Sequence, residues 1–343
     1  MSTHKKRVWS LMALLVVTAL VLGACTSVAT PAATTGASGD AAAPKAFKVG
    51  LVHPSPVTDA WSGQAYAALE QMQKELGAEI ANVEVADPAG YEKAFSDFGS
   101  QDYSLVIGHG FQYQDAAAKV APEFPNTFFT TVGGDKSAPN FAPIDLVPGY
   151  KQALYAMGVM AGQVSKSKKA AGFTLDIPAT KVPLEGFQAG FESIPGNTFS
   201  LVMLKDGNDV GAGKEAALQA MAGGADILIA NANLAGDGVL QAVAEQGGDK
   251  VYAIGTIGDQ TSKAPKNLLV SATLNIPQAL FAIGKAVKDG TMKGDQVRAF
   301  TLQDEDVYQF IYNPATASLV TPEVKAVVDD TLKKLQAGDI QVP

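Results

Sequence analysis

Short apolar runs and longer amphipathic stretches follow one another along most of the chain in two successive blocks. In the first block, apolar runs lie at 47–53, 80–86, 103–109, 126–132 and 141–147, with helical periodicity at about 59–77, 90–100 and 112–123. The second block has runs at 169–175, 198–204, 225–231, 250–256 and 267–274 and helical patterns at about 180–194, 210–222 and 235–247. Because strands separated by helices of this length form βαβ units, the pattern predicts an α/β protein with two doubly wound parallel-sheet lobes.

Two further helical patterns, at 149–165 and 321–340, join the blocks and close the chain. We expect a first lobe of 46–147 plus about 277–313, and a second of 148–276 plus about 314–343. Ligands bind beyond the carboxyl ends of the strands in open α/β sheets, so two facing lobes predict a cleft that closes about a hinge. The hinge is expected near 147–150 and 275–278.

The first 25 residues carry the pattern of an export signal. Lys5, Lys6 and Arg7 precede "VWSLMALLVVTALVLGAC", an apolar stretch shorter than the ~20 residues that span a bilayer. We predict a signal peptide over 1–24. The small, polar segment 25–45 cannot bury enough surface to fold, so we predict a flexible tether there.

The sequence "LGAC" at the end of the apolar stretch resembles the lipobox of bacterial lipoproteins. This resemblance implies that Cys25 carries lipid, palmitate included, and anchors the protein on the extracytoplasmic face of the cell membrane. An ordinary signal with a chance cysteine is the alternative. Since Cys25 is the single cysteine of the chain, no disulfide is expected and stability must come from a core.

The charge balance argues against nucleic acid as a partner. The formal net charge is −8, and loss of residues 1–24, which hold three cations and no acid, takes it to −11. Nucleic acids and anionic lipids attract basic surfaces. We therefore expect no nucleic acid as partner and membrane contact through the lipid anchor. We also expect a monomer.

Motifs for catalysis are missing from the sequence. It has no G-x-S-x-G elbow and no H-E-x-x-H pair, and His53 and His109 are the only histidines after the signal. The run "GAGKEA" at 211–216 lacks the spacing of a phosphate loop and reads as a turn and helix start. We expect no enzyme activity, no metal and no cofactor.

Polar and aromatic residues recur just after the predicted strands. Trp61, the only tryptophan besides Trp9, follows the first strand, where it either stacks on a ligand or packs on its own helix near Ala65 and Leu69. Asn and Asp are also ordinary turn residues, so each position alone has a structural explanation. Together they suit an uncharged, planar, hydrogen-bonding ligand.

Several ordered motifs resemble the Bmp (basic membrane protein) family of substrate-binding lipoproteins for ABC importers, which includes purine-nucleoside receptors. They are "KVGLV", "LVIGHGFQYQDAAAKVAPEFPNTFF", "PLEGFQAGFESI", "GADILIANANLAGDGVLQAVAEQG" and "IGTIGDQ". The resemblance implies a type I periplasmic-binding-protein-like fold, a purine nucleobase or nucleoside as ligand, and an importer permease as partner.

In that family the aromatic residue after the first strand stacks on the purine, and here this position is Trp61, with Ser62 beside it. Departures are Ile257 and Leu274 at positions associated with the sugar and Gly207 at a second stacking position, which leave base and nucleoside both open. The expected ligand-binding residues are Asp59, Trp61, Ser62, His109, Phe111, Asp115, Phe187, Asn208, Asn233, Asp259 and Asn275.

These patterns together predict a lipid-anchored solute receptor that delivers its ligand to an ABC importer. A lipoprotein that feeds a membrane sensor is one alternative, and an exported enzyme is another.

Overall fold

The computed structural model describes residues 46–58, 60–304 and 306–343. The expected signal, the tether, Cys25 and Asp59 lie outside these ranges. Ala46–Pro343 forms one compact unit. No helix in the described ranges is long and apolar enough to cross a membrane.

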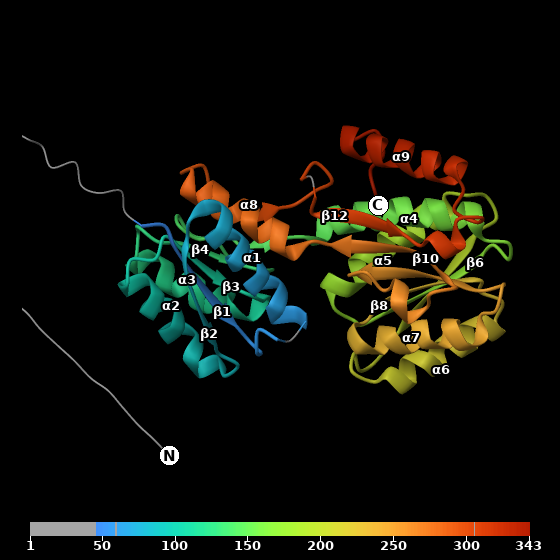
Figure 1. Cartoon of the computed structure of the whole chain (residues 1–343), viewed down its shortest axis with the longest axis horizontal. Coiled ribbons are helices and arrows are strands. Elements are labelled where there is room, and N and C mark those ends of the chain that lie inside the picture. The colour runs from blue at the N-terminus through green and yellow to red at the C-terminus, as the bar shows by residue number, and fades with distance from the viewer. Residues whose placement is uncertain (1–45, 59, 305) are drawn as a thin grey trace, which may run out of the picture. The chain divides into compact units, whose positions relative to one another are not determined.

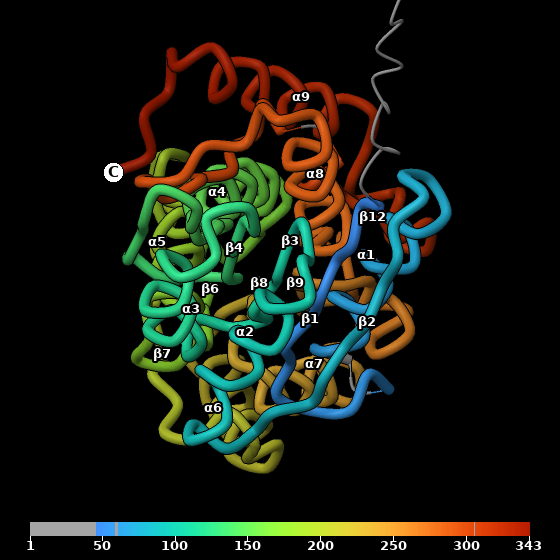
Figure 2. The backbone as a smooth tube through the Cα atoms, turned by 90° about the vertical axis from the view of Figure 1, so that its left-hand side faces the viewer, coloured from blue at the N-terminus to red at the C-terminus, as the bar shows by residue number. Residues whose placement is uncertain are grey.

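Four parallel strands form the smaller sheet in the order β2-β1-β3-β4, which can be followed across the view in Figure 2. The strands are β1 (Lys48–His53), β2 (Glu79–Glu84), β3 (Leu105–Gly108) and β4 (Phe128–Thr131), connected by α1 (Ala60–Leu76), α2 (Tyr91–Ser100) and α3 (Gln114–Val120). Successive strand residues point to opposite faces. Leu51 accordingly shares a core with Leu69 of α1, whereas Val52 shares another with Phe95 of α2. Helices therefore cover both faces, and α8 (Ile276–Lys288) packs beside α1.

Six strands form the larger sheet in the order β12-β10-β9-β8-β6-β7. They are β6 (Lys169–Thr174), β7 (Thr198–Met203), β8 (Ile227–Asn231), β9 (Tyr252–Ile257), β10 (Leu268–Leu274) and the antiparallel β12 (Tyr308–Tyr312). Figure 1 labels four of them, β12, β10, β8 and β6. One face packs on α4 (Val147–Val164), α5 (Pro178–Glu192) and α9 (Pro322–Ala337), and the other on α6 (Val210–Ala222) and α7 (Asn233–Gln246). Mixed α/β architecture with parallel sheets, as the apolar runs predict, is confirmed.

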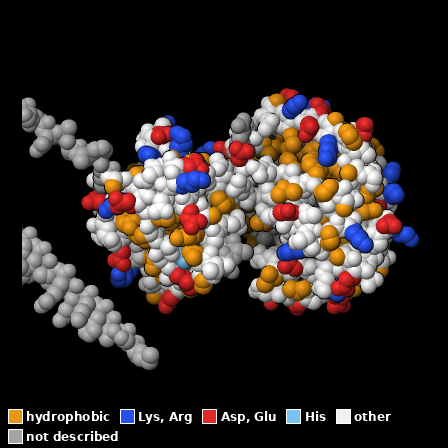
Figure 3. Space-filling view, in the orientation of Figure 1, with side chains coloured by type: hydrophobic (Ala, Val, Ile, Leu, Met, Phe, Trp, Pro, Cys, Tyr) orange, Lys and Arg blue, Asp and Glu red, His pale blue; other side chains and the backbone are white. Residues whose placement is uncertain are grey.

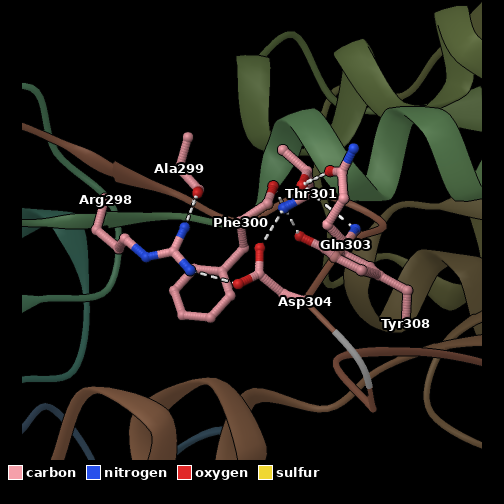
Figure 4. A network of polar contacts seen from close by, with 7 residues as sticks. All are labelled: Arg298, Ala299, Phe300, Thr301, Gln303, Asp304 and Tyr308. Carbon is pink, nitrogen blue, oxygen red and sulfur yellow. Dashed lines mark hydrogen bonds and ion pairs between the residues drawn. The ribbon is translucent and has the colours of Figure 1, made fainter. Parts of the chain in front are cut away.

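The chain passes between the two sheets three times. It does so through β5 (Ile144–Asp145) into α4, directly from β10 into α8, and through β11 (Arg298–Ala299) into β12. β5 and β11 pair with each other as a separate parallel ribbon. At the third crossing the guanidinium of Arg298 pairs with Asp304 and lies over the ring of Phe300 (Figure 4). The hydroxyl of Tyr308 donates to the carbonyl oxygens of Leu146 (2.9 Å) and Phe300 (3.3 Å), so the crossing segments are tied together.

A few elements differ from the sequence prediction. The run at 141–147 forms only the two-residue β5, and the apolar runs and helical patterns given above include no counterpart of β11 or β12. A helix after the hinge near 275–278 is present as α8. Residues 308–312, which we placed with the first lobe, form β12 and pair with β10 in the larger sheet. The exchange arises because the chain returns to the larger sheet after α8, a step that local periodicity does not encode. The remaining domain bounds stay a prediction.

Candidate functional site

Trp61 lies in the first turn of α1, after the loop that follows the carboxyl end of β1. Its indole ring stacks on the imidazole of His109, with ring centroids 4.1 Å apart and planes inclined by 26°. His109 follows β3, the neighbouring strand, and its Nε2 lies 2.9 Å from the carbonyl oxygen of Trp61. Trp61 keeps 38% of its surface exposed, whereas His109 is fully buried. The indole thus rests on a buried ring while presenting surface to solvent.

Burial sets the protonation state of His109. Desolvation lowers its pKa to about 4, and the charge of His53 acts in the same direction, against the hydrogen bond to Trp61. The imidazole is therefore neutral at physiological pH, with the proton on Nε2 donated to the carbonyl oxygen of Trp61. Nδ1 is then an acceptor, and it has no partner within the described part of the chain. A neutral ring suits stacking on the apolar face of the indole.

Ser62 holds the loop that precedes α1. Its side chain is buried and its Oγ lies 2.8 Å from Oγ of Ser55. The ring of His53 spans the same loop, with Nδ1 2.7 Å from the carbonyl oxygen of Ser55 and Nε2 3.0 Å from Oδ1 of Asn82. These contacts fix where α1 starts and hence where Trp61 lies.

Phe111 and Asp115 lie in the segment after β3. Phe111 is 68% exposed, so most of its ring lies in solvent. Asp115, in the first turn of α3, pairs with Lys136 at 2.5 Å on the surface. Asp115 is thus engaged by a lysine, whereas Phe111 presents its ring to solvent.

On the larger sheet, four expected residues lie at strand ends or in the loops that follow. Asn275 caps α8 by accepting the amide of Gln278 (3.2 Å). Asp259 accepts from the amide and hydroxyl of Thr261, and these bonds lower the pKa of its carboxyl. Asn208 and Asn233 are exposed in the loops before α6 and at the start of α7. Capping and turn geometry thus account for Asn275 and for one oxygen of Asp259.

Phe187 lies elsewhere. It is fully buried in α5, with its ring 6.2 Å from that of Phe191 and 5.7 Å from that of Phe199. Its position on the inner face of an amphipathic helix places it in the core of the larger sheet. The structure therefore does not bring Phe187 to the strand ends with the other candidates.

Two features at the strand ends have no signal in the sequence. Ile257, the last residue of β9, has a φ of +68°, and its N–H donates to the hydroxyl of Tyr150 (2.8 Å). That hydroxyl in turn donates to the carbonyl oxygen of Ala272 (2.9 Å). Tyr150 lies in the first turns of α4, so this buried hydroxyl connects a crossing segment to the edge of the larger sheet.

Other sites are less convincing as binding positions. One cavity of about 240 Å³ lies between the start of β4 and the end of α8, and one of about 290 Å³ lies between β12 and α9. Neither is lined by an expected ligand-binding residue.

Within the described ranges no cluster of three or more His, Cys, Asp or Glu could hold a metal. On the face seen in Figure 3, acidic and basic side chains are interspersed, so that face presents no single-sign field.

Comparison with known proteins gives a consistent result. A family model described as ABC transporter substrate-binding protein PnrA-like (Bmp) matches residues 46–340. A purine-binding protein of Brucella abortus is 24% identical over 309 residues, covering 88% of this chain and 84% of that protein. An uncharacterised lipoprotein of Pyrococcus abyssi is 28% identical over 251 residues, covering 68% of this chain and 61% of that protein. An ABC transporter solute-binding protein of Conexibacter woesei has the same fold, with a TM-score of 0.70 at 23% identity over 87% of this chain and 99% of that one.

Proposed function

From the premise that the chain belongs to the Bmp, PnrA-like family of ABC transporter substrate-binding proteins, we propose that it is a receptor for a purine-like ligand. We propose further that it is anchored by lipid and delivers this ligand to an importer. The ligand would lie between the carboxyl edges of the two sheets. The protein acts by binding and release, without chemistry on the ligand.

The observation that carries this proposal is the stack of Trp61 on His109. A ligand that covers an exposed aromatic ring gains free energy, because apolar area on both partners leaves water. Here the buried, neutral imidazole of His109 stacks on one face of the indole of Trp61. Its Nε2–H also donates a hydrogen bond to the backbone carbonyl oxygen of Trp61. A preorganised flat surface at a strand-end loop suits the face of a planar heterocycle. The printed name of the Brucella relative, a purine-binding protein, supports the same ligand class.

The three crossings support capture by closure. Each consists of few residues, and closure of two lobes requires only that short connecting segments take up the change in φ and ψ. Val147–Tyr150 and Asn275–Gln278 are the proposed hinge, together with the third crossing near Arg298. The hydrogen bond from the hydroxyl of Tyr308 to the carbonyl oxygen of Leu146 joins the first and third crossings, so we expect these two to move together.

The anchor rests on Cys25 and on the neighbouring relatives. Cys25 ends the apolar stretch of the predicted signal, and the Pyrococcus relative is named a lipoprotein. We propose that lipid on Cys25 holds the protein at the extracytoplasmic face of the cell membrane, within reach of a permease.

The test is to identify what the protein carries. The whole protein, purified quickly from its membrane, is denatured and the released small molecules are analysed by mass spectrometry. We expect a purine, and the recovered compound should bind back to emptied protein in calorimetry. Release of a sugar, an amino acid or a phosphorylated compound that binds back would contradict the proposed ligand class.

A further inference from the structure

The carboxyl edge of the larger sheet has a composition that the proposed function does not explain by itself. Four adjacent strands, β10, β9, β8 and β6, run parallel and therefore end at the same edge. At or within three residues of each of these ends lies an aliphatic side chain that is exposed or half-buried; these are Leu274, Ile257, Leu234 and Ile177. Leu175 and Ile276 also lie near the ends of β6 and β10, but they pack against the core. Leu234 is 54% and Ile177 46% exposed, and the other two are half-buried. We call these four residues the aliphatic band.

Several polar side chains near the aliphatic band are used to hold loops. Oδ1 of Asp259 accepts from Thr261, and the side chain of Asn275 caps α8. Asn231 is buried, and its Nδ2 donates to the carbonyl oxygen of Thr180 (3.1 Å). A ligand hydroxyl placed against the aliphatic band would therefore find few polar groups ready to bind it.

Two carboxamides are different. Asn208 and Asn233 are exposed, and neither side chain makes a hydrogen bond with another described residue. They flank Gly207, where an added Cβ would lie 3.0 Å from Nδ2 of Asn233. A carboxamide offers a donor and an acceptor side by side. Such a pair matches the edge of a heterocycle that carries both kinds of group.

Ile257 occupies the centre of the aliphatic band in a conformation that its side chain disfavours. Left-handed backbone is rare for a β-branched residue, and Asn, Asp or Gly would fit better. The hydroxyl of Tyr150 fixes the backbone by accepting its N–H. Strained residues of this kind persist where the surroundings hold them, and they concentrate at binding sites.

Resting on the proposed function, we infer that the site takes a free heterocyclic base and discriminates against the same base attached to a sugar, with Ile257 as a specificity-determining residue. A free base has two apolar faces and an edge of donors and acceptors. Trp61 and the aliphatic band match the faces, and the two carboxamides match the edge. A sugar adds hydroxyl groups that lose water on burial, and the aliphatic band gives them no hydrogen bonds in return.

Calorimetry with hypoxanthine and its nucleoside inosine tests the inference on the whole purified protein. We expect hypoxanthine to bind at least ten times more tightly than inosine. In Ile257→Asn, asparagine suits the left-handed backbone and adds a polar group. This variant should reduce the ratio of the inosine Kd to the hypoxanthine Kd about tenfold, while its melting temperature stays level or rises. Ile311→Asn is the matched control, because Ile311 is an exposed isoleucine on β12 of the same sheet. It should leave the ratio unchanged.

The possible failures can be told apart. Inosine binding as tightly as hypoxanthine, or more tightly, overturns this inference and leaves the proposed function standing. An unchanged ratio in folded Ile257→Asn overturns the role of Ile257. If neither compound binds and mass spectrometry recovers no purine, the proposed ligand class fails and this inference fails with it.

Discussion

Replacing Trp61 by alanine separates ligand binding from folding. The indole stacks on His109 on one side and keeps 38% of its surface exposed. The substitution removes both the stack and any ligand contact. It keeps the carbonyl oxygen at residue 61, which His109 needs as its hydrogen-bond acceptor. The backbone at the start of α1 should therefore survive, since alanine is also a favourable helix residue.

The expected losses differ in size. Stacking of an aromatic side chain on a base contributes roughly 1–3 kcal/mol, so Trp61→Ala should weaken binding about ten- to a hundredfold. An aromatic pair contributes about 0.5–1.5 kcal/mol beyond its buried area, which corresponds to a fall of a few degrees in melting temperature for a domain of this size. Trp61→Phe should recover most of the affinity because it restores a flat ring.

Fluorescence and calorimetry give independent readouts of this prediction. With residues 1–24 removed, Trp61 is the only tryptophan, so its emission reports directly on the site. Hypoxanthine should shift that emission in the wild type, and calorimetry should rank affinity as wild type, then Trp61→Phe, then Trp61→Ala. The reasoning is refuted if affinity in Trp61→Ala changes less than twofold while the melting temperature falls and ligand leaves the emission of the wild type unchanged.

Three further predictions follow from the anchor, the crossings and the buried histidine. Cys25→Ser should release the protein from membranes, and retention after a carbonate wash would contradict the lipid anchor. Small-angle scattering should show a smaller radius of gyration with saturating ligand than without it, and an unchanged radius would argue against closure. His109 should make the protein less stable as pH falls from 6.5 toward 4, because the unfolded chain binds a proton there that the folded chain, with a pKa of about 4, does not. Between pH 6.5 and 4.5 the free energy of unfolding should fall by about 2–3 kcal/mol less in His109→Leu than in the wild type, as measured by urea titration at each pH. An identical fall in both proteins would show that His109 does not cause it.

Much of the architecture follows from local periodicity. The apolar run at 169–175 and the helical pattern at 210–222, for example, correspond closely to β6 and α6. Local patterns work here because buried parallel strands are continuous apolar runs, whereas helices show a wider period. The two-residue strands β5 and β11 are too short to show either pattern. They pair with each other across about 150 residues of sequence, and Ile144 of β5 also bridges Val132 after β4. Neither two-residue segment has a pattern that indicates its partner.

The candidate site is less predictable for a related reason. The sequence predicts that Trp61 and His109 each follow a strand. That these two strands are neighbours comes from the order of the smaller sheet in the structure. The stacking of the two rings depends on the burial of His109, and the role of Ile257 depends on a φ angle fixed by the distant Tyr150. Phe187 shows the opposite difficulty, since an aromatic residue of a helix motif that resembles the family can serve packing alone.

The electrostatics of the two edges point to the same kind of ligand. Under Trp61 the imidazole is neutral because burial makes its charged form unfavourable. Opposite charges at the nearby surface are already paired, as Asp115 is with Lys136. An anionic ligand closed between these edges would lose its hydration without gaining a counter-charge from either the His109 stack or the aliphatic band. A neutral planar ligand loses little on desolvation and gains the stacking surface, so the residues that surround Trp61 and Ile257 favour uncharged bases over their phosphorylated forms.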